Sequence, residues 1–174
     1  MASSGVTRRG SSRAHSTHPK SCHERALGLL AVRPRARREL ERRLLAAGFE
    51  ADEVSDVLMR LERVGLIDDV AFAKQMAEHQ FTARRAGRRA VTSALLAKGI
   101  EPGLAAEAAE AAPDDEQDRA LDLARARSAR LAGVEPAKAF GRLTSLLVRR
   151  GYPPEIARFA ARRALEIDER DQVS

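Results

Sequence analysis

Apolar positions recur along this chain with helical spacing, and three times the recurrence stops at a glycine. The segments "RRELERRLLAAGF", "RRAVTSALLAKGI" and "GRLTSLLVRRGY" carry Gly48, Gly99 and Gly151 at or next to their ends. Leucine or valine spaced three and four residues apart indicates one buried face of an α-helix. A glycine followed by an apolar residue is typical of a left-handed C-cap, against which that residue packs back. The pattern therefore predicts three equivalent helices, each closed by a glycine.

These three helices belong to an internal repeat. The glycines are 51 and 52 residues apart. Large apolar side chains occupy the positions eight and four residues before each glycine and the position directly after it. They are Leu40, Val91 and Leu143; Leu44, Leu95 and Leu147; and Phe49, Ile100 and Tyr152. Agreement at several offsets in three copies indicates a repeated structural unit.

Each repeat is predicted to contain three helices. The helix that ends at the glycine is the second, because apolar residues with helical spacing also lie before it and after it. In the third copy this spacing predicts that the first helix extends to Leu131. It also predicts that Phe159 and Ile167 of the third helix face the core. Asp68 or Asp69 is expected to cap the first helix of the second copy.

The predicted fold is all-α: three tandem three-helix repeats that form an elongated, curved modular array. Alanine and leucine, both strong helix formers, dominate a sequence that is 44% apolar and only 3% aromatic. A unit of about fifty residues is marginal on its own, so neighbouring units are expected to share flanking surfaces. The expected boundaries are 1–21 for a disordered basic tail and 22–66, 67–112 and 113–174 for the three repeats.

Charge is segregated along the chain, which carries a formal net charge of +6. Residues 81–99 contain five bases and no acid, whereas residues 101–118 contain seven acids and no base. This separation favours a polyanion or a charged protein as partner.

Arginine doublets recur at matched positions. Arg37 and Arg38 stand eleven and ten residues before the first glycine, as Arg88 and Arg89 do before the second. A solvated helix face is the alternative to a binding surface, but the recurrence favours a shared surface. The residues predicted to meet a partner are Arg37, Arg38, Arg42, Arg84, Arg85, Arg88, Arg89, Arg142, Arg149 and Arg150.

No catalytic motif is present. The sequence lacks a phosphate-binding glycine loop, the paired histidines of a zinc protease, a serine nucleophile elbow and paired zinc cysteines. No catalytic, cofactor or metal site is therefore predicted, and we expect a protein that is not an enzyme. The cluster His15, His18, Cys22 and His23 could chelate a metal only adventitiously. A single cysteine and the lack of an apolar run of about 20 residues predict a cytoplasmic protein without a membrane span.

The segment "VGLIDDVAFAKQMAEHQ", residues 64–80, resembles the RecX family of bacterial regulators of the RecA recombinase. Its string "GLIDD..FA" is the most specific part, and the resemblance spans about residues 22–168. It implies an all-α modular protein that binds in the helical groove of the RecA–DNA filament. It also implies that the protein usually restrains ATP hydrolysis, strand exchange and coprotease activity. The family supplies no catalytic residues to carry over.

Two functions are thus weighed, besides a generic helical scaffold. The first is a monomeric regulator of the RecA filament that also contacts single- or double-stranded DNA without sequence preference. The alternative is a DNA-binding regulator of the helix-turn-helix type that acts without RecA.

Overall fold

The computed structural model describes residues 20–112 and 115–165 of the chain, and every regular element in these ranges is a helix. The predicted all-α fold is therefore confirmed. The elements are α1 (Cys22–Val32), α2 (Arg37–Leu45), α3 (Ala51–Arg63), α4 (Asp69–Thr82), α5 (Arg88–Lys98), α6 (Pro102–Glu110), α7 (Glu116–Ser128), a 3₁₀ helix η1 (Ala129–Leu131), α8 (Pro136–Arg149) and α9 (Pro154–Leu165). Most of the predicted tail, residues 1–19, and the predicted core residue Ile167 lie outside the described residues.

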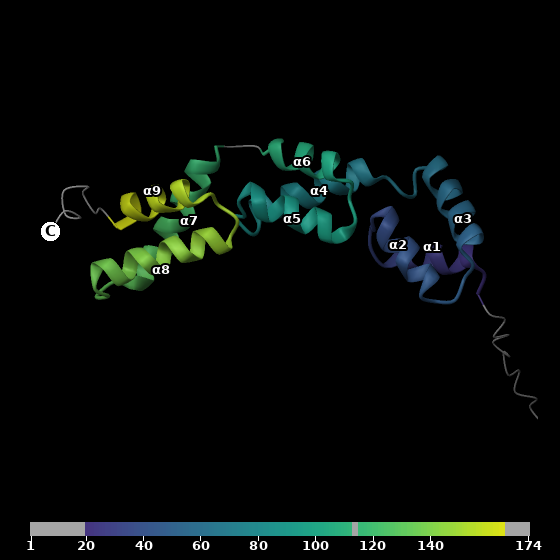
Figure 1. Ribbon diagram of the computed structural model, residues 1–174, viewed down its shortest axis with the longest axis horizontal. Coiled ribbons are helices and arrows are strands. Elements are labelled where there is room, and N and C mark those ends of the chain that lie inside the picture. Colours follow the sequence, from purple (N-terminus) through teal and green to yellow (C-terminus); the bar gives the residue numbers. More distant parts are fainter. Residues whose placement is uncertain (1–19, 113–114, 166–174) are drawn as a thin grey trace, which may run out of the picture.

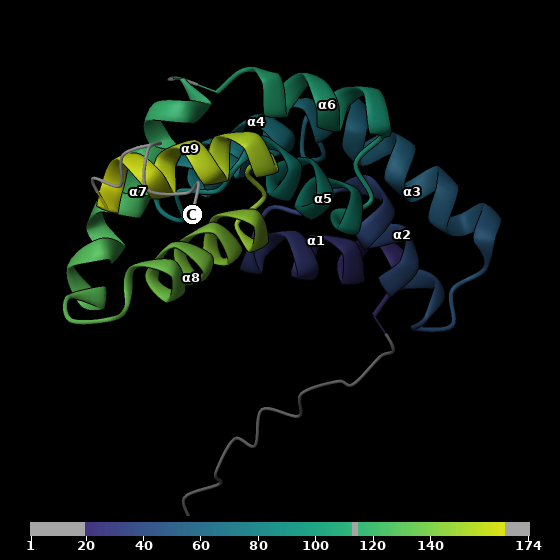
Figure 2. The same ribbon diagram turned by 60° about the vertical axis from the view of Figure 1, so that its left-hand side comes forward.

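The helices form an elongated array of three groups, with α1–α3 at one end and α7–α9 at the other (Figure 1). A turned view shows that the array is curved (Figure 2). We call α1–α3, α4–α6 and α7–α9 the first, second and third unit. An apolar cluster lies in each unit: one contains Leu58 and Ile67, one Phe81 and Ile100, and one Leu123 and Tyr152.

The aligned positions of the repeat occupy equivalent places in the three clusters. The leucines four residues before the glycines are fully buried, and the residues eight positions before are at most 1% exposed. Gly48, Gly99 and Gly151 have φ angles of +91°, +88° and +90°. These values lie in the left-handed region that non-glycine residues rarely adopt, so the predicted glycine caps are confirmed.

Side-chain caps define several of the helix starts. Ser21, the last residue of the predicted tail, forms a reciprocal capping box with Glu24 at the start of α1. Asp68 accepts a hydrogen bond from the Ala71 N–H at 2.9 Å, so it caps α4 as the sequence predicted. Asp69 is the first residue of α4 and has a different partner, described below.

Two core predictions in the third unit are wrong. Leu131 does not continue α7, because that helix ends at Ser128 and Leu131 belongs to the 3₁₀ turn that follows. Phe159 is 41% exposed, and α9 instead buries Ala157, Ala160 and Ala161. Alanine lets helices approach closely, so this face packs against α7 and α8 and the larger side chain is left outside.

Two of the three glycines also lie where neighbouring units touch. A Cβ atom on Gly99 would come within 2.6 Å of Cβ of Arg38 in the first unit. A Cβ atom on Gly151 would come within 2.4 Å of the backbone nitrogen of Ala90 in the second unit. Gly48 has open space at the same position. The absence of a side chain at Gly99 and Gly151 therefore lets each unit approach the one before it.

Alanine substitutions should separate the need for a left-handed backbone from the need for space between neighbouring units. Gly48→Ala should cost about 1–2 kcal/mol of stability, because only the left-handed backbone is strained. Gly99→Ala should cost more, and Gly151→Ala most, because its clash is with backbone. Thermal unfolding of the three variants measures this order. Gly28→Ala is the control: it lies inside α1 with open space around it and should stabilise by roughly 0.5–1 kcal/mol. Equal losses at the three glycines would contradict the packing role.

Candidate functional site

The predicted partner-facing arginines fall into two groups, one engaged inside the array and one facing solvent. Arg37 and Arg88 belong to the first group. Each is the first residue of the second helix of its unit, α2 or α5. Neither helix has a side-chain cap of its own, although the first N–H groups of any helix need partners.

The missing caps come from the next unit along the chain. The Arg37 N–H donates to Oδ1 of Asp69 at 2.8 Å, and the Arg88 N–H donates to Oε1 of Glu116 at 2.7 Å. Asp69 and Glu116 are the first residues of α4 and α7. An acid at the start of one unit therefore caps the second helix of the unit before it, in the same way at both junctions.

The side chains of the same two arginines are also neutralised. The Arg37 guanidinium lies 2.9 Å from a carboxylate oxygen of Glu62 in α3. The Arg88 guanidinium lies 3.3 Å from Glu116 and 3.5 Å from Glu110 in α6. The sequence placed these arginines on the partner surface because the doublets recur at matched positions. The structure instead gives Arg37 an ion pair within the first unit, and gives Arg88 one ion pair within the second unit and one with Glu116 of the third.

Burial affects the carboxyl of Asp69. Desolvation raises the pKa of Asp69, and the Arg37 N–H, which lowers it, offsets only part of that effect. Nearby Glu62 and Asp68 raise the pKa further. Because a raised pKa means that the folded state binds the proton more tightly, this group's contribution to stability diminishes as pH rises through its titration.

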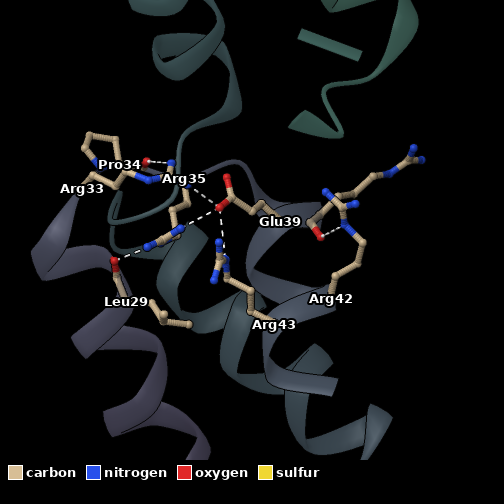
Figure 3. Close-up of polar contacts among 8 residues, drawn as sticks. Leu29, Arg33, Pro34, Arg35, Glu39, Arg42 and Arg43 are labelled. Carbon is tan, nitrogen blue, oxygen red and sulfur yellow. Dashed lines mark hydrogen bonds and ion pairs between the residues drawn. The ribbon is translucent and has the colours of Figure 1, made fainter. Parts of the chain in front are cut away.

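The buried acid Glu39 organises the loop between α1 and α2 (Figure 3). Its Oε1 atom accepts hydrogen bonds from Arg33 at 2.5 Å, Arg35 at 2.6 Å and Arg43 at 3.1 Å. Arg35 is itself buried and donates from Nε to the carbonyl of Leu29 at 3.0 Å. The pair Glu39–Arg43 follows from the sequence spacing, whereas the other two contacts bring the loop back onto α2.

The protonation of Glu39 reflects two opposed effects. Burial alone would raise the pKa of Glu39, but hydrogen bonds from the three arginines outweigh it and leave the pKa lowered. Glu39 therefore stays ionised in the folded protein, and its charge offsets part of the three positive charges around it.

The second group of predicted arginines faces solvent. These side chains are exposed, and none forms an ion pair with another residue of the described ranges. The group comprises Arg38, Arg42, Arg84, Arg85, Arg89, Arg142 and Arg149. Arg42 donates from Nε to the backbone carbonyl of Arg38 at 3.3 Å. Arg150 is half-buried and donates to the carbonyl of Arg84.

The described ranges offer no group of three or more metal-ligating side chains and no helix suited to crossing a membrane. Of the predicted histidine and cysteine cluster, His15 and His18 lie outside these ranges. Cys22 is buried in the first unit, and burial raises the pKa of its thiol. The thiol is therefore held protonated, the form that binds metals poorly.

These features define a class of protein: a curved array of three-helix units, joined by acid caps, that presents unpaired arginines to solvent. Models of the first and second three-helix domains of RecX match residues 22–61 and 68–108. The chain is 34% identical over 139 residues to the regulatory protein RecX of Amycolatopsis mediterranei (strain U-32), covering 79% of each chain. It is 38% identical over 148 residues to that of Mycolicibacterium smegmatis, covering 80% of this chain and 79% of that one.

A solved structure has the same fold. The crystal structure of RecX from Lactobacillus salivarius superposes with a TM-score of 0.74 at 20% identity, covering 84% of this chain and 96% of that one. The chain belongs to the RecX family of regulatory proteins.

Removing the junction acids should weaken the array. Asp69→Ala leaves the Arg37 N–H without its partner, and Glu116→Ala does the same to the Arg88 N–H. Each should cost about 1–3 kcal/mol, measured by chemical unfolding. Asp69→Asn retains an oxygen acceptor and should lose less. If Asp69→Ala unfolded like the wild type, the cap would contribute nothing to stability.

Glu39 should give a distinct pH signature. Because the pKa of Glu39 is lowered in the folded protein, the ionised carboxylate stabilises the fold at pH values above its unfolded-state pKa of about 4.5. This stability is lost as pH falls through the folded-state pKa. Glu39→Gln should destabilise by about 3 kcal/mol at neutral pH, because Arg35 loses its charged partner. It should also flatten the stability curve below pH 4.5. Unfolding measured against pH tests both, with the exposed Glu78→Gln as control; equal acid slopes for Glu39→Gln and wild type would refute the assignment.

Proposed function

We propose that this protein is a regulator that binds in the helical groove of the RecA–DNA filament and modulates the activities of RecA. The expected modulation is mostly inhibition, of ATP hydrolysis, strand exchange and coprotease activity. Membership of a family of regulatory proteins supports this proposal. In it the protein acts in the cytoplasm, as a monomer and without catalysis of its own.

The observation that carries the proposal is the set of exposed, unpaired arginines distributed over all three units. Such side chains gain from meeting carboxylates or phosphates, because no ion pair must first be broken. A filament offers both kinds of anion at regular intervals along its groove. Contacts made by successive units of one chain add through effective concentration, so that each contact can be weak.

The shape of the array supports the same proposal. The array is long and curved (Figures 1 and 2), which suits a helical groove better than a compact surface. The two acid caps hold consecutive units together by the same contact. One chain would thus present its arginines in a set order along the groove.

The alternative is a DNA-binding regulator that acts without RecA. Three-helix units and a net charge of +6 favour it. Against it stands α6, the third helix of the second unit, whose sequence PGLAAEAAE is poor in base-reading side chains: it contains no arginine, lysine, asparagine or glutamine, the residues that make the bidentate contacts to guanine and adenine. Reading of a specific sequence by this unit is therefore disfavoured.

A comparison of two double variants tests the proposal. Arg38→Ala with Arg89→Ala removes outward charge; it should leave thermal stability within about 0.5 kcal/mol of wild type and weaken inhibition of RecA ATPase on single-stranded DNA. Arg37→Ala with Arg88→Ala removes the ion pairs of the two paired arginines and should lower stability. Helicity should survive in both, because alanine is a strong helix former.

The two hypotheses give different results in this assay. Wild-type protein that leaves RecA ATPase unchanged at every ratio would overturn the proposed function. DNA binding with unchanged RecA activity would favour the alternative. An outward double variant that inhibits like wild type at every salt concentration would show that Arg38 and Arg89 are only solvated.

A further inference from the structure

The cluster around Glu39 carries more positive than negative charge (Figure 3). Three guanidinium groups, those of Arg33, Arg35 and Arg43, share the single oxygen Oε1 of this carboxylate. No other acid forms an ion pair with any of the three within the described part of the chain. The one carboxylate thus balances only part of the positive charge. Like charges held this close repel one another, so a further anion at the cluster would relieve the repulsion.

Two of the three arginines reach the surface. The side chains of Arg33 and Arg43 are 40% and 50% exposed, whereas Arg35 is buried. Arg43 bonds to Glu39 through Nε, and neither of its Nη groups has a hydrogen-bond partner among the described residues. A guanidinium has five N–H donors, so both exposed arginines keep donors for a ligand.

The cluster is fixed in place before any ligand arrives. Arg33 donates to the carbonyl of Pro34 at 3.1 Å as well as to Glu39, and Arg35 donates to the carbonyl of Leu29 at 3.0 Å. Because its pKa is lowered, Glu39 stays ionised and holds the arginines together. Long side chains that are already ordered lose less entropy when they bind.

A hollow of about 390 Å³ adjoins the cluster where the first unit meets the second, and Arg35 forms part of its lining. This volume lies within the range of roughly 300–1,000 Å³ that is usual for ligand pockets. The one acid in the lining, Asp68, accepts the Ala71 N–H at the start of α4, where the helix dipole offsets its charge. Four of the lining residues are apolar: Pro34, Leu66, Ala71 and Phe72.

Leu66 is the residue of the string "GLIDD" that the fold itself does not use. Gly65 has a φ of +72°, and Ile67 is buried in the core of the first unit. Asp68 caps α4, and Asp69 bonds to the start of α2. The Leu66 side chain is instead 52% exposed on the lining of the hollow. An exposed leucine there suits contact with an apolar group from outside.

We propose that this place binds an acidic and apolar segment of a protein partner, and we call it the anchor site. A carboxylate of the partner binds Arg33 and Arg43, and a neighbouring apolar side chain enters the hollow beside Leu66 and Phe72. Arginine pairs well with a carboxylate because its N–H groups can bind both oxygens. The two halves of the site therefore require two different side chains close together on one segment.

The charge of the first unit favours a protein segment over a nucleic-acid strand. Residues 22–66 contain nine bases and eight acids, whereas residues 116–165 contain eleven bases and five acids. A polyanion gains from a wide excess of positive charge, which the first unit lacks. A single carboxylate needs only the local excess at Glu39. A phosphate backbone also has no apolar side chain to fill the hollow.

This inference rests on the proposed function, because RecA would supply the segment, but the anchor site can be probed without RecA. The probe is a fluorescein-labelled peptide, Gly-Ser-Glu-Phe-Glu-Ser-Gly, followed by fluorescence anisotropy with the full chain. One comparison peptide has lysine for both glutamates, and another has alanine for phenylalanine. Wild type should bind the probe about tenfold more tightly than either, since charge-assisted bonds and apolar burial each contribute on that order.

Two variants test the two halves of the anchor site. Arg33→Gln with Arg43→Gln should abolish the preference for glutamate over lysine, and Leu66→Ser should abolish the preference for phenylalanine over alanine. The matched controls are Arg25→Gln with Arg60→Gln, two exposed arginines of the first unit, and Met59→Ser, which is 50% exposed. Both controls should bind like wild type. Circular dichroism checks the folding of each, and Leu66→Ser leaves the Glu39 cluster intact if the arginine variant unfolds.

The remaining outcomes each decide the matter. Equal binding of the three peptides, or equal losses in the variants and their controls, would overturn the anchor site. So would a thymidine oligonucleotide that displaced the probe as well as unlabelled probe does, because the site would then take phosphate. RecA ATPase measured on the same proteins separates the two proposals. If wild type fails to inhibit but the peptide preferences hold, the proposed function fails and the anchor site stands. If wild type inhibits and the preferences are absent, the reverse is true.

Discussion

The array depends on one interaction, the hydrogen bond that an acid at the start of one unit accepts from the second helix of the unit before it. Helices α2 and α5 start without caps of their own and are completed by Asp69 and Glu116 of the next unit. In contrast, α8 is the second helix of the third unit, and it is capped by Glu135, the residue directly before it. The Glu135 side chain accepts hydrogen bonds from two N–H groups of α8. The helix ends of the first two units are thus satisfied only when the following unit is docked, which couples the folding of neighbours.

This constraint also divides the arginine doublets. The first arginine of each doublet stands at the helix start, where its N–H bonds to the acid of the next unit. Its side chain forms ion pairs, with Glu62 of the same unit for Arg37 and with Glu116 of the next unit for Arg88. The second arginine, Arg38 or Arg89, is one residue further along, is exposed and forms no ion pair within the described ranges. One repeated sequence feature therefore supplies both a junction and an outward charge, and only the outward charge is available to a partner.

Local features of the fold were predictable from the sequence, and contacts between units were not. The glycines and the leucines four residues before them are local signals, because cap geometry and helical period involve residues within a few turns. The bonds Arg37–Asp69 and Arg88–Glu116 join residues 32 and 28 positions apart, and their existence depends on the angle between units. The prediction for Phe159 was wrong because apolar residues with helical spacing lie on two faces of α9. The face that packs against the neighbouring helices is the one with Ala157, Ala160 and Ala161. The repeat boundaries and the binding role of the arginines remain predictions.

The two junctions share the acid cap but differ in what surrounds it. At the first junction, Ala36 of the α1–α2 loop is fully buried in the apolar cluster of the second unit. At the second junction, the corresponding residue is Gly87, whose N–H bonds to the end of α8 and which is packed too tightly against Gly151 to carry a side chain. The first junction therefore extends the apolar core of the second unit into the first. The second junction is instead a hydrogen-bonded contact between the loop before α5 and the end of α8. At the second junction the basic residues of two units are brought to one hollow, because Arg84 comes from the loop side and Arg149 and Arg150 come from the helix end. A surface that needs charge from two units can therefore form at the second junction, and its geometry is set by the same contacts that hold the units together.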